Sequence, residues 1–78
     1  MPPYAPPPDW VLARRRAVGE RIRGARAAKR LSQEALAERA GLDRQAINRI
    51  ELRHQSPVLD NLIRIAAALN VPLADLVR

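Results

Sequence analysis

The apolar positions between residues 10 and 77 recur at spacings of three, four and seven, which is typical of helices that pack through one face. The pattern predicts five helices and no strand. Their expected ranges are residues 10–30, 33–40, 44–51, 58–69 and 73–77. Aromatic residues are scarce, so the core must consist of Leu, Ile, Val and Ala. The expected fold class is therefore all-α, a compact bundle of five helices.

The same spacings predict which side chains face the core. The stripe expected in the first helix consists of Val11, Val18, Ile22 and Ala25. Gly19 interrupts this helix, and because glycine weakens a helix by up to about 1 kcal/mol relative to Ala, it predicts a break there. The inward positions expected in residues 58–69 are Leu59, Leu62, Ile63, Ala66 and Leu69, with Ile65 beside them.

Capping chemistry predicts several helix ends. Asp9 is expected to cap the first helix, and Asn70 to end the fourth. Ser32 and Asp43 can each accept a hydrogen bond from an N-terminal amide of the second and third helices. Gly41 between them can supply the left-handed backbone that ends a helix. Residues 32–51 therefore predict two short helices joined by a tight turn.

The third expected helix has two chemically different faces. At about 100° per residue, four polar side chains fall within an arc of roughly 140°. These are Arg44, Gln45, Asn48 and Arg49, and the opposite side carries Ala46, Ile47 and Ile50. Arginine can donate two hydrogen bonds to guanine, while Gln and Asn can pair with adenine. The polar face therefore suits the base edges of DNA, although a solvated helix face of the same composition is the alternative.

Length and charge agree with a small domain that binds a polyanion. The 78 residues carry a formal charge of +6, and between Trp10 and Arg30 eight Lys or Arg residues accompany a single acid, Glu20. The structural alternative is that these long basic side chains only solubilise a helix face. Five of the seven prolines lie in residues 1–8, so we expect a proline-rich flexible arm before a domain spanning residues 9–78.

The residues that other kinds of chemistry require are scarce. There is no cysteine, and His54 is the one histidine, so neither a disulfide framework nor a thiolate or multi-histidine metal site is expected. No nucleophile has an evident base, so we expect no enzyme and no cofactor. No apolar run reaches the roughly 18 residues of a membrane span. The N-terminus also lacks an apolar stretch of the signal-peptide type, which favours a cytoplasmic protein.

Several short motifs together resemble the Cro and lambda-repressor helix-turn-helix family of bacteria and phages. They are Ile22-Arg23 followed by Arg26, the run Leu31-Ser32-Gln33-Glu34-Ala35-Leu36-Ala37, the run Ile47-Asn48-Arg49-Ile50-Glu51, and Leu62 through Leu69 followed by Val71-Pro72-Leu73. The resemblance covers residues 17–77. It implies the five-helix DNA-binding fold of that family, with a helix-turn-helix at the second and third helices, and a location at the bacterial nucleoid.

The resemblance also implies roles for individual residues. The bases would be read by Arg44, Gln45, Asn48 and Arg49. DNA phosphates would be bound by Ser32, Gln33, Arg53 and His54. Arg26 would pair with Glu51 and fix the first helix to the third. Arg53 stands where the family usually has glycine, so the loop after Glu51 is expected either to be strained or to turn differently.

The expected function is sequence-specific binding of double-stranded DNA by a transcriptional regulator. We expect a homodimer on a near-palindromic operator, with no membrane contact, no sensor domain and no small-molecule ligand. Leu73, Leu76 and Val77 share one stripe of the last helix, and we expect one of them to fill the core and the others to contact a second copy. The alternative is an adaptor that binds another protein through the same bundle. Phage-type repressors, restriction–modification controllers and antitoxins all remain open as subclasses.

Overall fold

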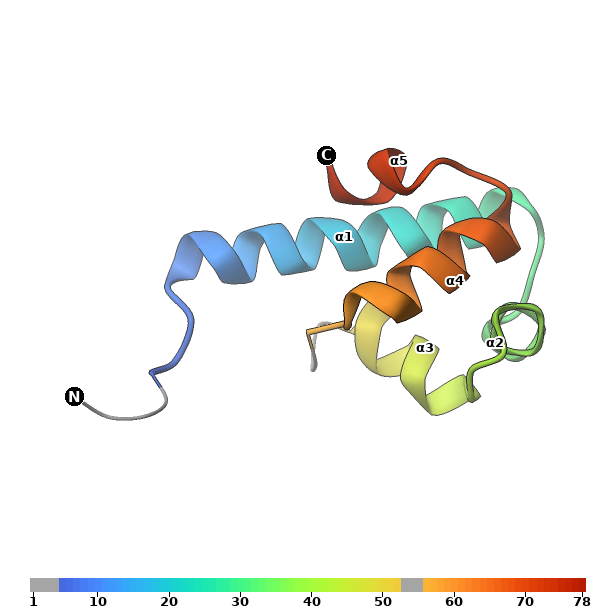
Figure 1. Ribbon diagram of the computed structural model, residues 1–78, viewed down its shortest axis with the longest axis horizontal. Helices are drawn as coiled ribbons and strands as arrows, with labels where there is room; N and C mark the ends of the chain where they lie inside the picture. Colours follow the sequence, from blue (N-terminus) through green and yellow to red (C-terminus); the bar gives the residue numbers. More distant parts are fainter. Residues whose placement is uncertain (1–4, 53–55) are drawn as a thin grey trace.

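The computed structural model consists of five α-helices (Figure 1), and it describes residues 5–52 and 56–78. The helices are α1 Asp9–Ala28, α2 Gln33–Ala40, α3 Arg44–Glu51, α4 Leu59–Leu69 and α5 Leu73–Val77. The described part of the chain contains no strand. The all-α fold expected from the sequence is therefore confirmed. Arg53 and His54, two expected phosphate contacts, lie outside the described residues.

The helix α1 is the longest element, and the others gather around its C-terminal half (Figure 1). In this view α5 lies above α1, α2 and α3 lie below it, and α4 contacts both α1 and α5. The largest fully buried side chains come from all five helices: Ile22, Leu36, Ile47, Ile65, Leu69 and Leu76. Since every helix contributes to one aliphatic core, α3 is held in place by the whole bundle.

Three of the helices end in the same hydrogen-bonded turn. At the ends of α1, α2 and α4, two backbone amides donate hydrogen bonds to carbonyl oxygens of the last helical turn. In α1, the Leu31 amide donates to the Arg26 carbonyl oxygen, and the Arg30 amide donates to that of Ala27. The residue in the left-handed position of each turn is Arg30 (φ 56°), Gly41 (φ 71°) and Asn70 (φ 56°), respectively. Glycine and asparagine suit this conformation, whereas arginine is strained there.

The capping expectations are mostly confirmed. Ser32 Oγ accepts from the Ala35 amide at 3.0 Å, and Asp43 Oδ1 accepts from the Ala46 amide at 2.7 Å. The expectation for Asp9 was wrong, because Pro8 is the N-cap and Asp9 is already the first helical residue. A carboxylate there still interacts favourably with the positive end of the helix dipole. The helix also ends at Ala28, two residues earlier than expected, because Arg30 adopts the left-handed conformation.

The expected break at Gly19 is absent, since α1 continues through it. Gly19 is buried against the C-terminal end of α3. A Cβ atom at this position would lie 2.6 Å from the carbonyl oxygen of Ile50 and 3.3 Å from that of Glu51. Glycine is therefore the residue that lets the two helix backbones meet, and this packing outweighs its low helix propensity.

The prediction of which α4 side chains face the core was also partly wrong. Leu59 and Ile63 are 60% and 48% exposed, whereas Ile65 is fully buried. At about 100° per residue the inward positions expected in α4, together with Ile65, span an arc of roughly 160°. The bundle covers only the part of this arc around Ile65, Ala66 and Leu69. The remaining part faces outward.

Candidate nucleic-acid interface

The outer face of α3 carries the four side chains that the sequence placed there. Arg44, Gln45 and Arg49 are exposed, and Asn48 is half-buried. Behind them, Ile47 and Ile50 are buried in the core. A short helix with a polar outer face on an apolar support is suited to enter a groove without deforming, because packing sets its position while Arg44, Gln45 and Arg49 stay exposed.

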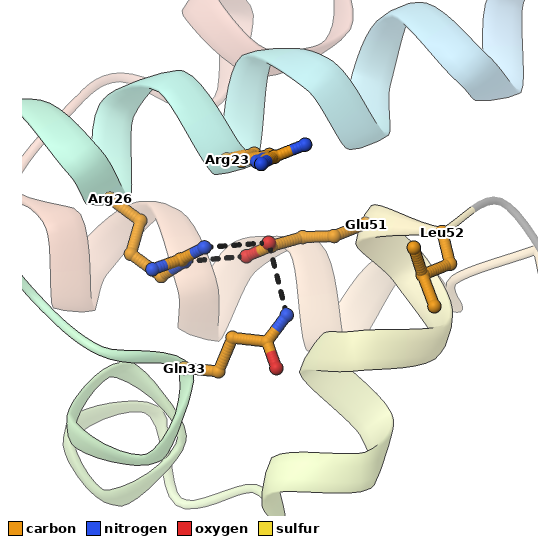
Figure 2. A pocket seen from close by; sticks show the side chains of 5 residues that line it. All are labelled: Arg23, Arg26, Gln33, Glu51 and Leu52. Atoms are coloured by element: carbon orange, nitrogen blue, oxygen red, sulfur yellow. Dashed lines mark hydrogen bonds and ion pairs between the residues drawn. The ribbon is translucent and has the colours of Figure 1, made fainter.

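An ion pair joins α1 to the C-terminal end of α3 (Figure 2). Arg26 Nε donates to Glu51 Oε2 at 2.7 Å, and Arg26 Nη2 donates to Glu51 Oε1 at 2.9 Å. This two-bond geometry is the strongest form of a guanidinium–carboxylate contact. Arg26 Nη1 also donates to the Leu31 carbonyl oxygen at 2.8 Å. Arg26 therefore connects three segments: α1, the turn before α2, and α3.

Burial makes this pair important for the position of α3. Glu51 is only 7% exposed and is a charged residue within the buried set. Hydrogen bonding to the Glu51 carboxylate raises the pKa of the Arg26 guanidinium above its ordinary value. Burial lowers this pKa, and the negative charge of Glu51 raises it further. The guanidinium thus stays charged in every practical buffer, and the buried carboxylate keeps its counter-charge.

Gln33, the first residue of α2, extends this pair toward the outer face of α3 (Figure 2). Gln33 Nε2 donates to Glu51 Oε1 at 3.2 Å and lies 3.4 Å from Asn48 Oδ1. The resemblance implied a phosphate contact for Gln33, but it did not imply these links. No sequence pattern signals them, because the residues are 18 and 15 positions apart. Ser32, the other expected phosphate contact at this helix start, is exposed.

A hollow of about 170 Å³ opens where α1, α2 and α3 meet. It is lined by Arg23, Arg26, Gln33, Glu51 and Leu52 (Figure 2). Leu52 lies one turn beyond Asn48, so the hollow continues the outer face of α3. Arg23 is exposed and was not among the expected site residues. With two guanidinium groups and one carboxylate, the lining carries an excess of positive charge.

The three side chains expected at a subunit contact lie in different environments. Leu76 is 1% exposed and belongs to the core, and Leu73 is half-buried against it. Val77 is 44% exposed. Val77 is therefore the member of the set that is most available to a second copy.

Two other kinds of site are absent from residues 5–52 and 56–78. No group of three His, Cys, Asp or Glu side chains that could hold a metal ion occurs there. In this same part of the chain, no helix combines the length and apolar character needed to cross a membrane.

Comparison with known proteins gives a consistent assignment. The restriction-modification controller protein C.AhdI from Aeromonas hydrophila is similar in structure, with a TM-score of 0.80 and 38% identity over 82% of this chain and 97% of that one. A hypothetical transcription factor, NHTF, from Neisseria is similar with a TM-score of 0.81 and 32% identity over 100% of this chain and 87% of that one. No curated protein sequence matches. The sequence profile of the helix-turn-helix family matches residues 22–76, so the chain belongs to that family.

Proposed function

We propose that this protein is a transcriptional regulator that binds double-stranded DNA as a homodimer and reads sequence with the outer face of α3. The observation that carries the proposal is the arrangement of α3 itself. Arg44, Gln45 and Arg49 are exposed on a helix whose other side is anchored by Ile47 and Ile50. Such side chains form hydrogen bonds with base edges in the major groove.

The similar structures support the regulatory part of the proposal. One is described as a restriction-modification controller protein and the other as a hypothetical transcription factor. Both share at least 32% identity with this chain over at least 82% of its length. A similar role for this chain is the simplest inference from that similarity, with control of transcription as the class of activity.

Contacts with the DNA backbone would set the register of α3. We place phosphates at the start of α2, beside Ser32 and Gln33, and we extend the same role to Arg53 and His54, which follow α3 in the sequence. Phosphate contacts position a protein on the duplex but carry no sequence information. A net charge of +6 favours the same polyanionic partner.

Dimerisation would bring two copies of α3 into successive major grooves about 34 Å apart, so the operator is expected to be near-palindromic. We place the subunit contact at the outer edge of α5, with Val77 at its centre and Leu73 beside it. Because Leu76 is buried in the core, it would pack beneath this edge and not contact the second copy. An isologous contact would pair Val77 with the same patch on the second copy.

Selection of bound duplexes from a random pool tests the proposal directly. A two-fold symmetric site with half-sites one helical turn apart is the expected product. Gln45→Ala and Arg49→Ala should each weaken binding to that site by about 1–3 kcal/mol and relax the preference at particular base pairs. Arg14→Ala removes an exposed side chain elsewhere on α1 and should leave the selected sequence unchanged. Failure to enrich any sequence would contradict the proposal.

A further inference from the structure

The helix α1 is attached to the C-terminal end of α3 at two points along its length. Arg26 forms the buried ion pair with Glu51. About two turns nearer the N-terminus, Gly19 packs so closely against the backbone of Ile50 that no Cβ atom fits between them. Two attachments fix the direction of a helix as well as its position. Because α1 is continuous through Gly19, the part of α1 that precedes this residue also has a fixed direction relative to α3.

Two arginines lie on either side of Gly19 along one flank of α1. Arg16 precedes Gly19 by three residues and Arg23 follows it by four, so they lie about 4.5 Å and about 6 Å from it along the helix axis. At 100° per residue, the two arginines differ by about 20° around the helix, and each lies within about 60° of Gly19. The end of α3 therefore meets α1 between two positions that carry a guanidinium group.

Neither of these arginines has an ionic partner in the part of the chain that the structure describes. Both are exposed, and the one salt bridge within residues 5–52 and 56–78 is that of Arg26 with Glu51. Glu20 is the one acid between the two arginines in the sequence, and it lies about 40–60° to the side of them. Both guanidinium groups are therefore available to an anion outside the protein.

We propose that Arg16 and Arg23 bind two phosphates of the DNA backbone strand that borders the major groove at the C-terminal end of α3. The inference rests on the proposed function, since it requires that α3 lies in that groove. Arg23 lines the hollow that continues the outer face of α3. Arg16 lies nearer the part of α1 that extends beyond the other helices (Figure 1). It precedes residues 22–76, over which the family profile matches, so the longer first helix of this chain would add this contact.

The chemistry of the two side chains favours phosphates over base edges. A guanidinium group stays charged and can donate two parallel hydrogen bonds to phosphate oxygens. Arg16 and Arg23 are about 10 Å apart along α1, which suits two separate phosphates better than one. Contacts with phosphates fix the orientation of a protein on the duplex. Since α1 is attached to α3 beside both arginines, these two contacts would set the angle at which α3 enters the groove.

Neutralising the phosphates of the selected operator one at a time tests this inference. A methylphosphonate group removes a single backbone charge. In each half-site, the parent should be weakened at one phosphate on which Arg16→Gln no longer depends, and at a second on which Arg23→Gln no longer depends. Each substitution should also flatten the plot of log affinity against log salt by about 1 per subunit, and the double variant by about 2. The selected sequence should stay the same in all of them.

The matched control is Arg14→Gln. Arg14 is exposed on the same helix, about 160° around it from Arg16. This substitution should flatten the salt dependence less than Arg16→Gln does, and binding should still depend on every phosphate that the parent requires. If Arg16→Gln matched Arg14→Gln in both measurements while the parent still selected an operator, the inference would be overturned and the proposed function would stand. If the parent selected no sequence, the proposed function itself would fail, and the inference with it.

Discussion

Gly19 of α1 lies so close to Ile50 of α3 that a Cβ atom at position 19 would be 2.6 Å from the Ile50 carbonyl oxygen. The obstructing atom belongs to the backbone at the end of α3, so a larger residue has to push α3 away from α1. The distance between these two residues therefore couples the stability of the bundle to the position of α3.

Replacing Gly19 with alanine should lower the free energy of unfolding by about 1–3 kcal/mol, because overpacking outweighs the better helix propensity of alanine. Gly24 is the matched control, since a Cβ atom there would meet nothing within 4 Å. Gly24→Ala should raise the free energy of unfolding by up to about 1 kcal/mol. Urea unfolding followed by helical circular dichroism measures both. Equal effects of the two substitutions would show that α1 and α3 are not in tight contact at Gly19.

Arg30 offers a substitution that should stabilise the protein. It occupies the left-handed position after α1 with φ 56°, where Gly41 stands after α2. Glycine has no steric penalty in this conformation, so Arg30→Gly should raise the free energy of unfolding by about 1 kcal/mol. Lys29→Gly, at a residue with φ −93°, should instead be neutral or destabilising. A lower melting temperature for Arg30→Gly than for the parent would contradict this.

Helix caps in this chain could be predicted from the sequence, whereas features that depend on contacts between helices could not. Ser32, Asp43 and Gly41 were placed correctly because capping depends on a few neighbouring atoms. Gly19 was interpreted wrongly because its reason for being glycine is a carbonyl oxygen 31 residues later in the chain. In general, a helix break and a close helix crossing both call for glycine, and only the structure distinguishes them.

The same contrast between local features and features set by packing applies to α4 and to the candidate nucleic-acid interface. The apolar arc of α4 is wider than the surface that the bundle covers, so its pattern could not show that Ile65 is buried and Ile63 exposed. The polar face of α3 could be predicted, because it follows from helical periodicity alone. The link between Gln33 and Asn48 could not, since it depends on how α2 and α3 are placed relative to each other.

Removing one partner of the buried ion pair should be costly. Arg26→Met leaves the Glu51 carboxylate buried without its counter-charge and should lower the free energy of unfolding by about 3–5 kcal/mol. The double variant Arg26→Met with Glu51→Met should lose much less than the sum of the two single variants, because no uncompensated charge remains. Thermal or urea unfolding of all four proteins measures this coupling. Additive losses would mean that the two side chains do not interact in solution.

Arg23 should contribute to the salt dependence of DNA binding. It lines the hollow that continues the outer face of α3, where a backbone phosphate could approach. Arg23→Gln should flatten the plot of log affinity against log salt by about 1 per subunit, without changing the preferred sequence. Arg14→Gln removes one positive charge at a position about 180° around α1 from Arg23, so it measures the general effect of a lower net charge. Equal slopes for the two variants would place Arg23 away from the DNA.

The proposed subunit contact can be tested at Val77. This side chain is 44% exposed at the end of α5, so Val77→Glu should leave the fold of each subunit intact. Two glutamates facing each other across a two-fold axis would repel each other, and both carboxylates would lose their water without gaining a hydrogen-bond partner. The mass measured by analytical ultracentrifugation should therefore shift toward that of the monomer. Binding to an operator with two half-sites should weaken far more than binding to a single half-site. Ile63→Glu is the control, because Ile63 is similarly exposed but lies on α4. If Ile63→Glu rather than Val77→Glu produced the monomer, the copies would meet through the outward part of the α4 apolar arc, beside Leu59.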